Sequence, residues 1–217
     1  MYKKKPLFIV FEGVEGCGKS FQSKKLFKNL KKKGFKSILT REPGGTRSAE
    51  SIRSLILQDY FNKGKEEKFD KYTDTLLYLA ARNEHIKNKI KPALNKNDIV
   101  ICDRFIDSTI AYQVYGKNVN KTFIDNIHKF ILQGVKPTIT FILKVSPKSS
   151  KLRLAKRRTK NRYDNFSQSF YSKAQKSFIK ISKNKKNYFV LNSTFNNNDL
   201  EKKIFNIVCK FLKVKYE

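Results

Sequence analysis

The stretch with the clearest chemistry lies near the start of the chain, where Gly13–Ser20 reads Gly-Val-Glu-Gly-Cys-Gly-Lys-Ser. It fits the G-x-x-x-x-G-K-[ST] pattern of a P-loop, in which glycines let backbone N–H groups surround a polyphosphate. In such a loop Lys19 reaches the β- and γ-phosphates of ATP, and the Ser20 hydroxyl binds Mg²⁺. The residues expected at ATP are Gly13, Val14, Glu15, Gly16, Cys17, Gly18, Lys19 and Ser20. The alternative is an ordinary Gly-rich turn between a strand and a helix.

The elements that must position this loop are predicted by the apolar residues around it. Residues 7–11 form an unbroken apolar run, as in a strand buried on both faces, and helical spacing follows from Phe21 onward. Further strands are predicted at 37–40, 99–102, 139–143 and 188–191. Because helical patterns separate these strands, we expect an α/β protein with the three-layer P-loop NTPase fold: a central five-stranded parallel sheet flanked by helices. Nothing resembles a linker, so residues 1–217 are predicted to form one domain.

Charged side chains follow the second and third strands at the points where they end. In parallel sheets ligands lie at the carboxyl ends of the strands. We therefore expect Arg41, Asp103 and Arg104 at the same edge as the P-loop. Two local signals limit the helices nearby: Thr46 is expected to cap one, and a long helix is expected to stop near Pro92.

The composition is strongly basic, with 48 Lys and Arg against 18 Asp and Glu and a net charge of +30. Such a charge is compatible with nucleic-acid or anionic-membrane binding. However, the lysines are spread along the whole chain, and a bias toward Lys, Asn, Ile and Phe is what an AT-rich coding sequence gives. We therefore expect weak salt-sensitive RNA or DNA binding and no specific nucleic-acid partner.

Cysteine content and hydropathy bear on the compartment. The three cysteines are far apart and form neither a metal-ligand spacing nor a disulfide framework, which fits a reducing cytoplasm. The apolar run after Lys3–Lys5 is too short for a signal peptide, and no stretch is long enough to span a membrane. Cys17 is a candidate for thiol oxidation if the helix N-terminus lowers its pKa.

Two further stretches separate kinases from other P-loop proteins. Arg41–Thr46 reads Arg-Glu-Pro-Gly-Gly-Thr, and Asp103–Phe105 reads Asp-Arg-Phe. Together with Glu12–Ser20, Leu79–Arg82 and Ile90–Leu94, in this order and spacing, they resemble the bacterial thymidylate kinases. The resemblance extends from the N-terminus to about residue 171 and, more loosely, to the last helix. It implies ATP-dependent phosphorylation of dTMP to dTDP, a step of dTTP biosynthesis, by a Mg²⁺-dependent enzyme that is typically a homodimer.

The same resemblance implies roles for residues that would bind the acceptor. Arg53 and Arg104 would hold its phosphate, and Asp103 would lie near Mg²⁺ with Ser20. Tyr78 lies where the family has an aromatic that stacks on thymine, and Arg82 would hydrogen-bond the base. The remaining contacts would be Thr109 and Gln113 with the base, Tyr112 at the 2′ position of the sugar and Glu15 with its 3′-hydroxyl.

Residue chemistry supports these roles independently. Arginine binds a phosphate with two parallel hydrogen bonds, whereas lysine is a point charge, and this lysine-rich chain keeps only nine arginines. Most of them fall in the candidate ligand segments. Two structural alternatives remain open: Asp103 and Arg104 could simply pair with each other, and Tyr78 could be a core residue of its helix. His85 and His128 are expected at the surface or at helix caps, without a catalytic role.

The acceptor is a phosphate, which is largely ionised near neutral pH and needs no general base. Catalysis is therefore expected from alignment and from positive charge supplied by Lys19, Arg104 and Mg²⁺. The resemblance adds that Gly16 stands where eukaryotic-type enzymes carry an arginine, and that bacterial enzymes supply the charge from a mobile lid, here about 153–165. Arg157, Arg158 and Arg162 are the candidates over the phosphates, with Arg153 near the adenine. The alternative is a solvated basic helix end.

The lid and the segment before it depart from the family pattern. The family often has Asp after the fourth strand, where this chain has Lys144, and the lid reads Asn161-Arg162-Tyr163-Asp164 in place of Asp-Arg-Phe-Glu. Two other functions remain open: a deoxynucleoside kinase of the same superfamily, and a basic P-loop protein that binds nucleic acid. Arg53 and the Arg-Glu-Pro-Gly-Gly-Thr segment argue against the first, and the absence of an aromatic-rich basic stretch argues against the second.

Overall fold

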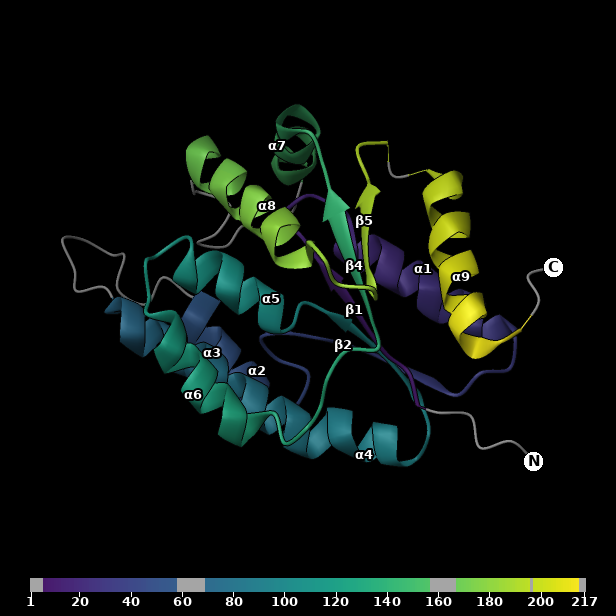
Figure 1. The fold of residues 1–217 in the computed structure, drawn as a ribbon, viewed down its shortest axis with the longest axis horizontal. Coiled ribbons are helices and arrows are strands. Elements are labelled where there is room, and N and C mark those ends of the chain that lie inside the picture. The colour runs from purple at the N-terminus through teal and green to yellow at the C-terminus, as the bar shows by residue number, and fades with distance from the viewer. Residues whose placement is uncertain (1–5, 58–68, 157–166, 196, 215–217) are drawn as a thin grey trace.

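The computed structural model describes residues 6–57, 69–156, 167–195 and 197–214. Five parallel strands form one sheet in the order β2-β3-β1-β4-β5, with helices on both faces (Figure 1). The strands are β1 (Phe8–Glu12), β2 (Ser37–Arg41), β3 (Ile99–Asp103), β4 (Ile139–Lys144) and β5 (Tyr188–Asn192). The predicted fold class is confirmed, and each strand lies within one residue of its predicted bounds.

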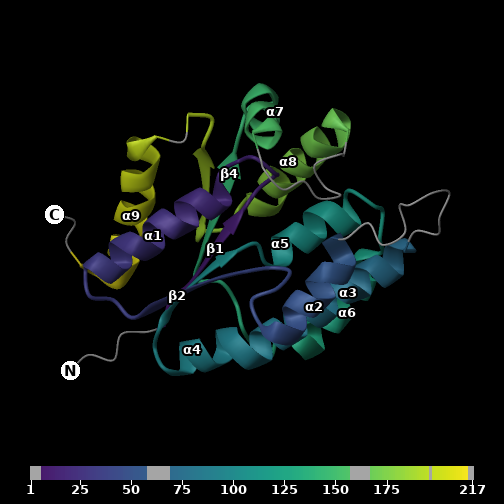
Figure 2. The same cartoon turned by 180° about the vertical axis from the view of Figure 1, so that it is seen from behind.

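The helices of the described residues fall into two groups around this sheet, as the two opposite views show (Figures 1 and 2). On one side α1 and α9 lie next to each other, and on the other α2, α3 and α6 form a second group. The bounds are α1 (Lys19–Lys32), α2 (Arg47–Leu57), α3 (Lys71–His85), α4 (Lys91–Asn95), α5 (Ile106–Thr109), α6 (Lys121–Ile131), α7 (Pro147–Ala155), α8 (Gln168–Ser182) and α9 (Asn198–Leu212). Two π-helical stretches, η1 (Ile86–Ile90) and η2 (Ile110–Val114), continue α3 and α5.

The central strand β1 shows why its sequence is apolar throughout. Phe8 and Val10 pack into a cluster with η1 and α4, whereas Ile9 and Phe11 face a cluster that contains α1 and α9. All five residues of β1 are buried, including Glu12, its last residue. A strand buried on both faces leaves no place for the alternating polar residues of a half-exposed strand.

The helix predicted to stop near Pro92 continues to Asn95. The wider turn of η1 re-registers the backbone hydrogen bonds, and Lys91 N donates to Ile86 O, five residues back. Pro92 then lies in the first turn of α4, where a missing N–H costs little. The short helix α5 and its continuation η2 were not predicted from the apolar pattern.

The carboxyl ends of the inner strands meet at one edge, as expected. In the register of the sheet Asp103 pairs with both Arg41 of β2 and Phe11 of β1, and Arg104 N donates to Phe11 O at 2.9 Å. The P-loop, Arg41, Asp103 and Arg104 therefore lie together. Residues 95–98 match the Asn-Lys-x-Asp motif with which GTPases bind guanine. They lie at the amino end of β3, on the opposite edge of the sheet from the P-loop.

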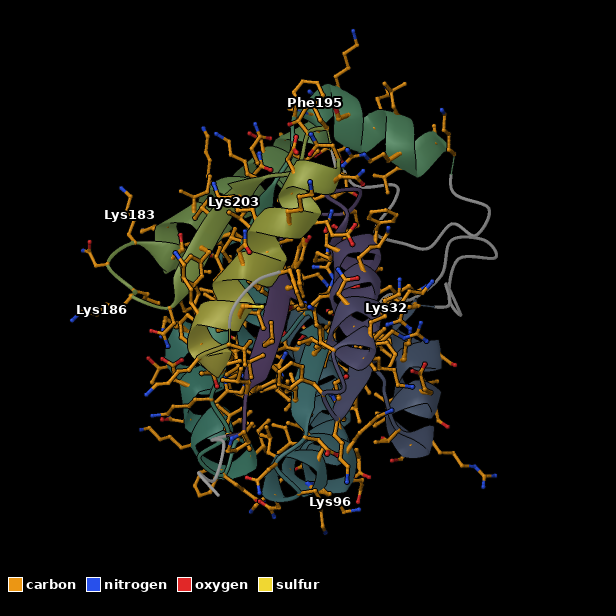
Figure 3. All side chains as sticks on the ribbon, turned by 90° about the vertical axis from the view of Figure 1, so that its right-hand side faces the viewer. Lys32, Lys96, Lys183, Lys186, Phe195 and Lys203 are labelled. Carbon is orange, nitrogen blue, oxygen red and sulfur yellow. The ribbon has the colours of Figure 1, made fainter. Side chains whose placement is uncertain are left out.

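The lysines are distributed over the surface and are not confined to one element. Figure 3 shows Lys32 and Lys203 on the neighbouring helices α1 and α9, Lys96 after α4, and Lys183 and Lys186 before β5, all exposed. This spread is what the sequence indicated. Among the described helices, none is both long and apolar enough to cross a membrane.

Candidate active site

The P-loop connects β1 to α1 through glycines in left-handed or related conformations. Gly13 and Gly16 have φ values of 137° and 71°, and Gly18 at the start of α1 has φ 94°. A Cβ on Gly13 would lie 2.6 Å from Leu143 O, and one on Gly16 would lie 2.8 Å from Ser150 O. Gly13 and Gly16 are therefore required for both conformation and space.

Lys19 points back into the loop that precedes it. Its Nζ donates to Gly13 O at 3.0 Å and to Val14 O at 2.8 Å, and the residue is only 6% exposed. The ammonium group is therefore held at the centre of the loop by two weak neutral acceptors, which a phosphate would replace with stronger charged ones.

Ser20 and Asp103 form the candidate magnesium site. The Ser20 hydroxyl donates to Asp103 Oδ2, while the buried Oδ1 of Asp103 has no hydrogen-bond partner among the described residues. Hydroxyl and carboxylate oxygens are hard ligands that suit Mg²⁺, which is commonly held by one or two protein oxygens together with substrate phosphates. Accordingly, no cluster of three or more His, Cys, Asp or Glu ligands is found in the described part of the chain.

Arg104 links the P-loop to the segment after β3. Its guanidinium donates to Gly13 O at 3.0 Å, to Ser108 Oγ at 3.0 Å and to Glu15 Oε1 at 2.7 Å. The hydrogen-bond partner of the Asp103 carboxylate is Ser20, so the simple Asp103–Arg104 ion pair is not the arrangement found. Arg104 adopts φ 74°, a conformation that directs its side chain toward the P-loop and is uncommon outside glycine.

Glu15 is held between Arg104 and Tyr112. Its second carboxylate oxygen accepts from the Tyr112 hydroxyl at 2.6 Å, and the Arg104 guanidinium lies over the Tyr112 ring, 5.3 Å from its centroid. Burial alone would raise the pKa of Glu15, but the charges of Arg104 and Lys19 lower it below its usual value. Glu15 is therefore ionised at neutral pH.

Arg82 of α3 is the centre of a buried network that also includes α6, the turn after β2 and the residue before α5. Its guanidinium donates to Glu42 Oε2 at 2.8 Å and to Phe105 O at 2.9 Å, and its Nη1 lies 2.8 Å from His128 Nε2. His85 Nδ1 is 3.1 Å from Glu42 Oε1. Burial would raise the pKa of Glu42, but the Arg82 charge and the His85 hydrogen bond lower it. The network fixes α3 and α6 to the turn after β2.

The two histidines were expected at the surface or at helix caps, and this prediction was wrong, because both are buried and their side chains contact other side chains. His85 is 0% exposed and His128 is 5% exposed. Burial and the charge of Arg82 lower the pKa of His128 to about 3, so its neutral Nε2 accepts a hydrogen bond from Arg82. Isolated histidines carry no sequence signal for this role, because their partners come from distant elements.

The turn after β2 contains a second group of charges. Glu50 of α2 accepts from Arg41 Nη2 at 3.1 Å and from Gly45 N at 2.9 Å, and Arg53 donates to Pro43 O at 2.6 Å. Burial lowers the pKa of Arg53, and the positive charge of Arg41 lowers it further. Two guanidinium groups close enough to perturb each other form an anion-attracting region. Thr46 Oγ1 accepts from Ala49 N, which confirms the predicted cap of α2.

These groups surround one cleft of about 390 Å³. The predicted acceptor residues that line it are Glu15, Arg53, Tyr78, Arg82, Arg104, Thr109, Tyr112 and Gln113, and the predicted ATP and metal residues are Gly16, Gly18, Lys19, Ser20, Asp103 and Arg153. Within the described residues, the buried Nε2 of Gln113 has no hydrogen-bond partner. The structure therefore brings the two predicted groups together.

The segment after β4 is docked on the P-loop. Arg153 of α7 donates to the carbonyl oxygens of Gly16 at 3.0 Å and Thr194 at 2.7 Å, and Ser150 Oγ donates to Glu15 O at 2.8 Å. Arg153 thus joins the P-loop to the connection between β5 and α9. The other lid candidates, Arg157, Arg158 and Arg162, lie outside the described residues.

Cys17 differs from the expectation of a reactive thiol. Its side chain is 0% exposed, and burial raises the pKa of the thiol although Lys19 is nearby. No functional role was predicted for Glu12, Glu42, Ser108 or His128. Glu12 and Glu42 lie in the Glu12–Ser20 and Arg41–Thr46 segments, and a charged residue at the end of a strand or in a turn could have indicated a role for them.

Comparisons with known proteins agree with this geometry. A family model described as thymidylate kinase matches residues 11–204. Among curated relatives, a thymidylate kinase of Prochlorococcus marinus (strain AS9601) is 43% identical and covers 87% of this chain and 89% of its own. One from Aster yellows witches'-broom phytoplasma is 40% identical over 97% of this chain and 99% of its own. The crystal structure of thymidylate kinase from Ehrlichia chaffeensis matches with a TM-score of 0.73 at 32% identity, covering 94% of this chain and 98% of that one.

Proposed function

Because the chain belongs to the thymidylate kinase family, we propose that its cleft holds ATP at the P-loop and dTMP beside Arg104. The enzyme catalyses the ATP-dependent phosphorylation of dTMP to dTDP, a step of dTTP biosynthesis. The main support for this assignment is that Arg104 directly links the P-loop to the proposed acceptor side of the cleft. Arg104 contacts both Gly13 and Glu15 of the P-loop and lies in the wall of the same cleft as Lys19.

Arg53 and Arg104 hold the acceptor phosphate in this proposal. Both are largely buried and line the cleft, and their planar groups suit two oxygens of one phosphate. Burial, and then the positive charge of Arg41, lowers the pKa of Arg53, and the nearby Glu50 carboxylate opposes this only in part. A bound phosphate would add negative charge beside Arg53 and Arg41.

The base and sugar occupy the part of the cleft lined by α3, α5 and η2. Tyr78 and Arg82 of α3 contact the base, together with Thr109 and Gln113. The buried Nε2 of Gln113 supports this, since it has no hydrogen-bond partner within the described part of the chain and needs one. Tyr112 stacks with Phe170 at 5.9 Å, which keeps its ring in the position that would crowd a 2′-hydroxyl and so favours deoxyribose. Glu15 is placed at the 3′-hydroxyl.

Mg²⁺ is the implied cofactor, and the oxygens of Ser20 and Asp103 would hold it. The buried Oδ1 of Asp103, which no described residue hydrogen-bonds, supports this assignment. When bound, the ion would neutralise charge on the ATP phosphates and orient them. Every other part of the catalysis is assigned to side chains of the chain itself.

Phosphoryl transfer requires no general base here. An ionised oxygen of the acceptor phosphate attacks the γ-phosphorus of ATP, the bond from that phosphorus to the β–γ bridging oxygen breaks, and ADP leaves as dTDP forms. Lys19 exchanges its carbonyl partners for phosphate oxygens and stabilises the developing charge. Arg157, Arg158 and Arg162 of the lid add further positive charge, because Gly16 carries none.

The biological setting is proposed as a homodimer in the cytoplasm, with no specific nucleic-acid partner. Three free, buried cysteines suit a reducing compartment. The spread of exposed lysines over separate elements supports a general, salt-sensitive affinity for polyanions (Figure 3). Sedimentation would test the dimer, and a salt titration would separate RNA binding, which falls steeply with salt, from turnover of dTMP, which persists at physiological salt.

A coupled ADP-release assay with several acceptors tests the assignment directly. We expect turnover with dTMP far above that with thymidine, CMP or GMP, and dUMP provides a measure of how the base is read. High turnover with thymidine and none with dTMP would favour the deoxynucleoside kinase alternative. Absence of any turnover with dTMP would contradict the proposed function.

A further inference from the structure

Glu12 is a buried carboxylate at the centre of the molecule to which no catalytic or binding role has been given. It is the last residue of β1, directly before Gly13, and it is 0% exposed. Its Oε1 accepts from Phe105 N at 2.8 Å and Ser108 N at 3.2 Å, and its Oε2 accepts from Ser108 Oγ at 2.6 Å. All three of these donors belong to the segment that follows β3.

These bonds act as a helix cap supplied from another strand. Phe105 is the N-cap residue of α5 and offers no side-chain cap of its own. The first N–H groups of a helix need an acceptor, which is usually the side chain of the N-cap residue itself. Here the Glu12 carboxylate receives the N–H groups of the N-cap and of the third helical residue, Ser108. Glu12 therefore fixes the start of α5, which continues into η2.

The same carboxylate also reaches the acceptor-phosphate arginine through one side chain. Arg104 Nη1 donates to Ser108 Oγ at 3.0 Å, and the Ser108 hydroxyl donates in turn to Glu12. Because arginine can only donate, the Ser108 hydroxyl is oriented with its hydrogen toward Glu12 and a lone pair toward Arg104. Glu12, Ser108 and Arg104 thus form a chain of two hydrogen bonds, the relay. It joins the end of β1, directly before the P-loop, to the wall of the cleft.

We propose that Glu12 is a positioning residue for acceptor binding: its carboxylate places Arg104 and the start of α5 relative to the P-loop. The proposal depends on the assignment of Arg104 to the acceptor phosphate. It explains how the end of β1 can set the distance between the ATP site and the dTMP site, since the P-loop begins at the residue after Glu12. Thr109, Tyr112 and Gln113, on the helix that Glu12 caps, are placed by the same contact.

The environment of Glu12 raises its pKa, so the ionised side chain does not stabilise the fold even though it positions other residues. Burial, and then the charge of Asp107 on α5, raise the pKa of Glu12 to about 8, against the opposing effects of Ser108 and Arg104. Cys102 of β3 and Tyr188 of β5 are the other titratable groups that face it. A folded-state pKa above that of the unfolded chain means that stability falls as pH rises from about 4.5 to about 8. Ionisation of Glu12, which is complete only above about pH 8, thus costs stability, while its two oxygens accept the hydrogen bonds of Phe105 and Ser108.

The test is Glu12→Gln, assayed at pH 8.5 where the wild-type carboxyl is mostly ionised: the change keeps the size of the side chain, removes its charge and replaces one acceptor oxygen by an amide. We expect the KM for dTMP to rise about tenfold, the effect of weakening one hydrogen bond to a charged group, while the KM for ATP stays within about twofold. The melting temperature at pH 8.5 should not fall. Asp74→Asn is the matched control, because Asp74 is also a buried carboxylate, paired with Lys117 at 2.6 Å, and does not line the cleft.

A second variant keeps the proposal testable if Glu12→Gln folds poorly. Ser108→Ala cuts the relay without touching the capping N–H groups, and it should raise the KM for dTMP by a smaller factor at unchanged stability. The double variant should show less than the product of the two single effects. Arg104→Lys reports on the assignment itself. If it raises the KM for dTMP while Glu12→Gln and Ser108→Ala do not, the positioning role is wrong; if Arg104→Lys has no effect, the assignment of Arg104 is wrong.

Discussion

The P-loop takes its shape from backbone conformation, whereas the acceptor side of the cleft takes its shape from buried ion pairs. Gly13 and Gly16 adopt positive φ, and Lys19 rests on carbonyl oxygens of the loop itself. In contrast, Arg82 and Arg104 are each paired with a carboxylate and further acceptors from distant elements. The donor side can therefore lose a side chain without loss of fold, while the acceptor side cannot.

Lys19→Met should give the largest change in activity and almost none in stability. Removing one preorganised charged donor at the transferred phosphoryl group lowers kcat by roughly 10²–10³-fold. Because the hydrogen bonds of the ammonium group to residues that the structure describes are those to loop carbonyls and the Cys17 sulfur, the melting temperature should stay nearly unchanged. Steady-state kinetics and calorimetry on the same sample check this. A large loss of stability would show that the donor side also depends on side-chain pairing.

Arg82→Leu should instead give a large loss of stability, in addition to the weaker dTMP binding expected when a base contact is removed. Glu42 would remain buried without its main charge partner, which costs about 3–5 kcal/mol of unfolding free energy. Denaturant unfolding measures it, with Arg47→Leu as the control because Arg47 is exposed on α2. Equal stabilities of the two variants would remove the distinction between the two sides.

Arg104→Lys tests whether the acceptor side needs the shape of arginine as well as its charge. Lysine cannot hold Gly13, Ser108 and Glu15 together and still present a fork to phosphate. We expect kcat/KM for dTMP to fall by about 10–100-fold, against less than twofold for Arg47→Lys. Similar tolerance at both positions would mean that charge alone suffices.

His128→Gln should give the smallest effect near neutral pH, and its effect on stability should appear only as the pH falls. The wild-type pKa of about 3 keeps His128 neutral in the fold, while the unfolded chain takes up a proton below about pH 6.5. Stability is therefore lost as pH falls from about 6.5 toward 4, by roughly 1.4 kcal/mol per pH unit from this group. Glutamine can still accept from Arg82 and does not titrate, so its curve should be flatter. Parallel curves from urea unfolding at pH 6.5, 5.5 and 4.5 would rule out the neutral acceptor.

The P-loop could be predicted from the sequence more accurately than the contacts on the acceptor side of the cleft, for a physical reason. A loop held by backbone conformation leaves a contiguous signature of glycines, so Gly13–Ser20 and the strand before it could be placed with accuracy. A network held by side chains draws one residue from each of several elements, as with Glu42, Arg82 and His128. Periodicity identifies each element but does not show which polar residues meet. The role of Glu12 was missed for the same reason, because its partners lie 93 and 96 positions away.

Tertiary context also decided the details of the helices. Pro92 was expected to end a helix, but the π-helical turn before it re-registers the hydrogen bonds and lets the helix continue. The short helix α5 has no apolar period of its own, and its first turn depends on a carboxylate of β1. Neither feature is visible in a local window of sequence.

Because Cys17 is buried, the rate at which its thiol is labelled can be used to measure local opening of the P-loop. The three cysteines are free and buried, and the Cys17 sulfur lies close beneath Gly13, where an added Cβ would be 2.9 Å away. A thiol reagent can reach this sulfur only when the loop opens locally, so the rate of alkylation measures how often that happens. A nucleotide that closes the loop around its phosphates should slow the labelling in proportion to the fraction of enzyme it occupies.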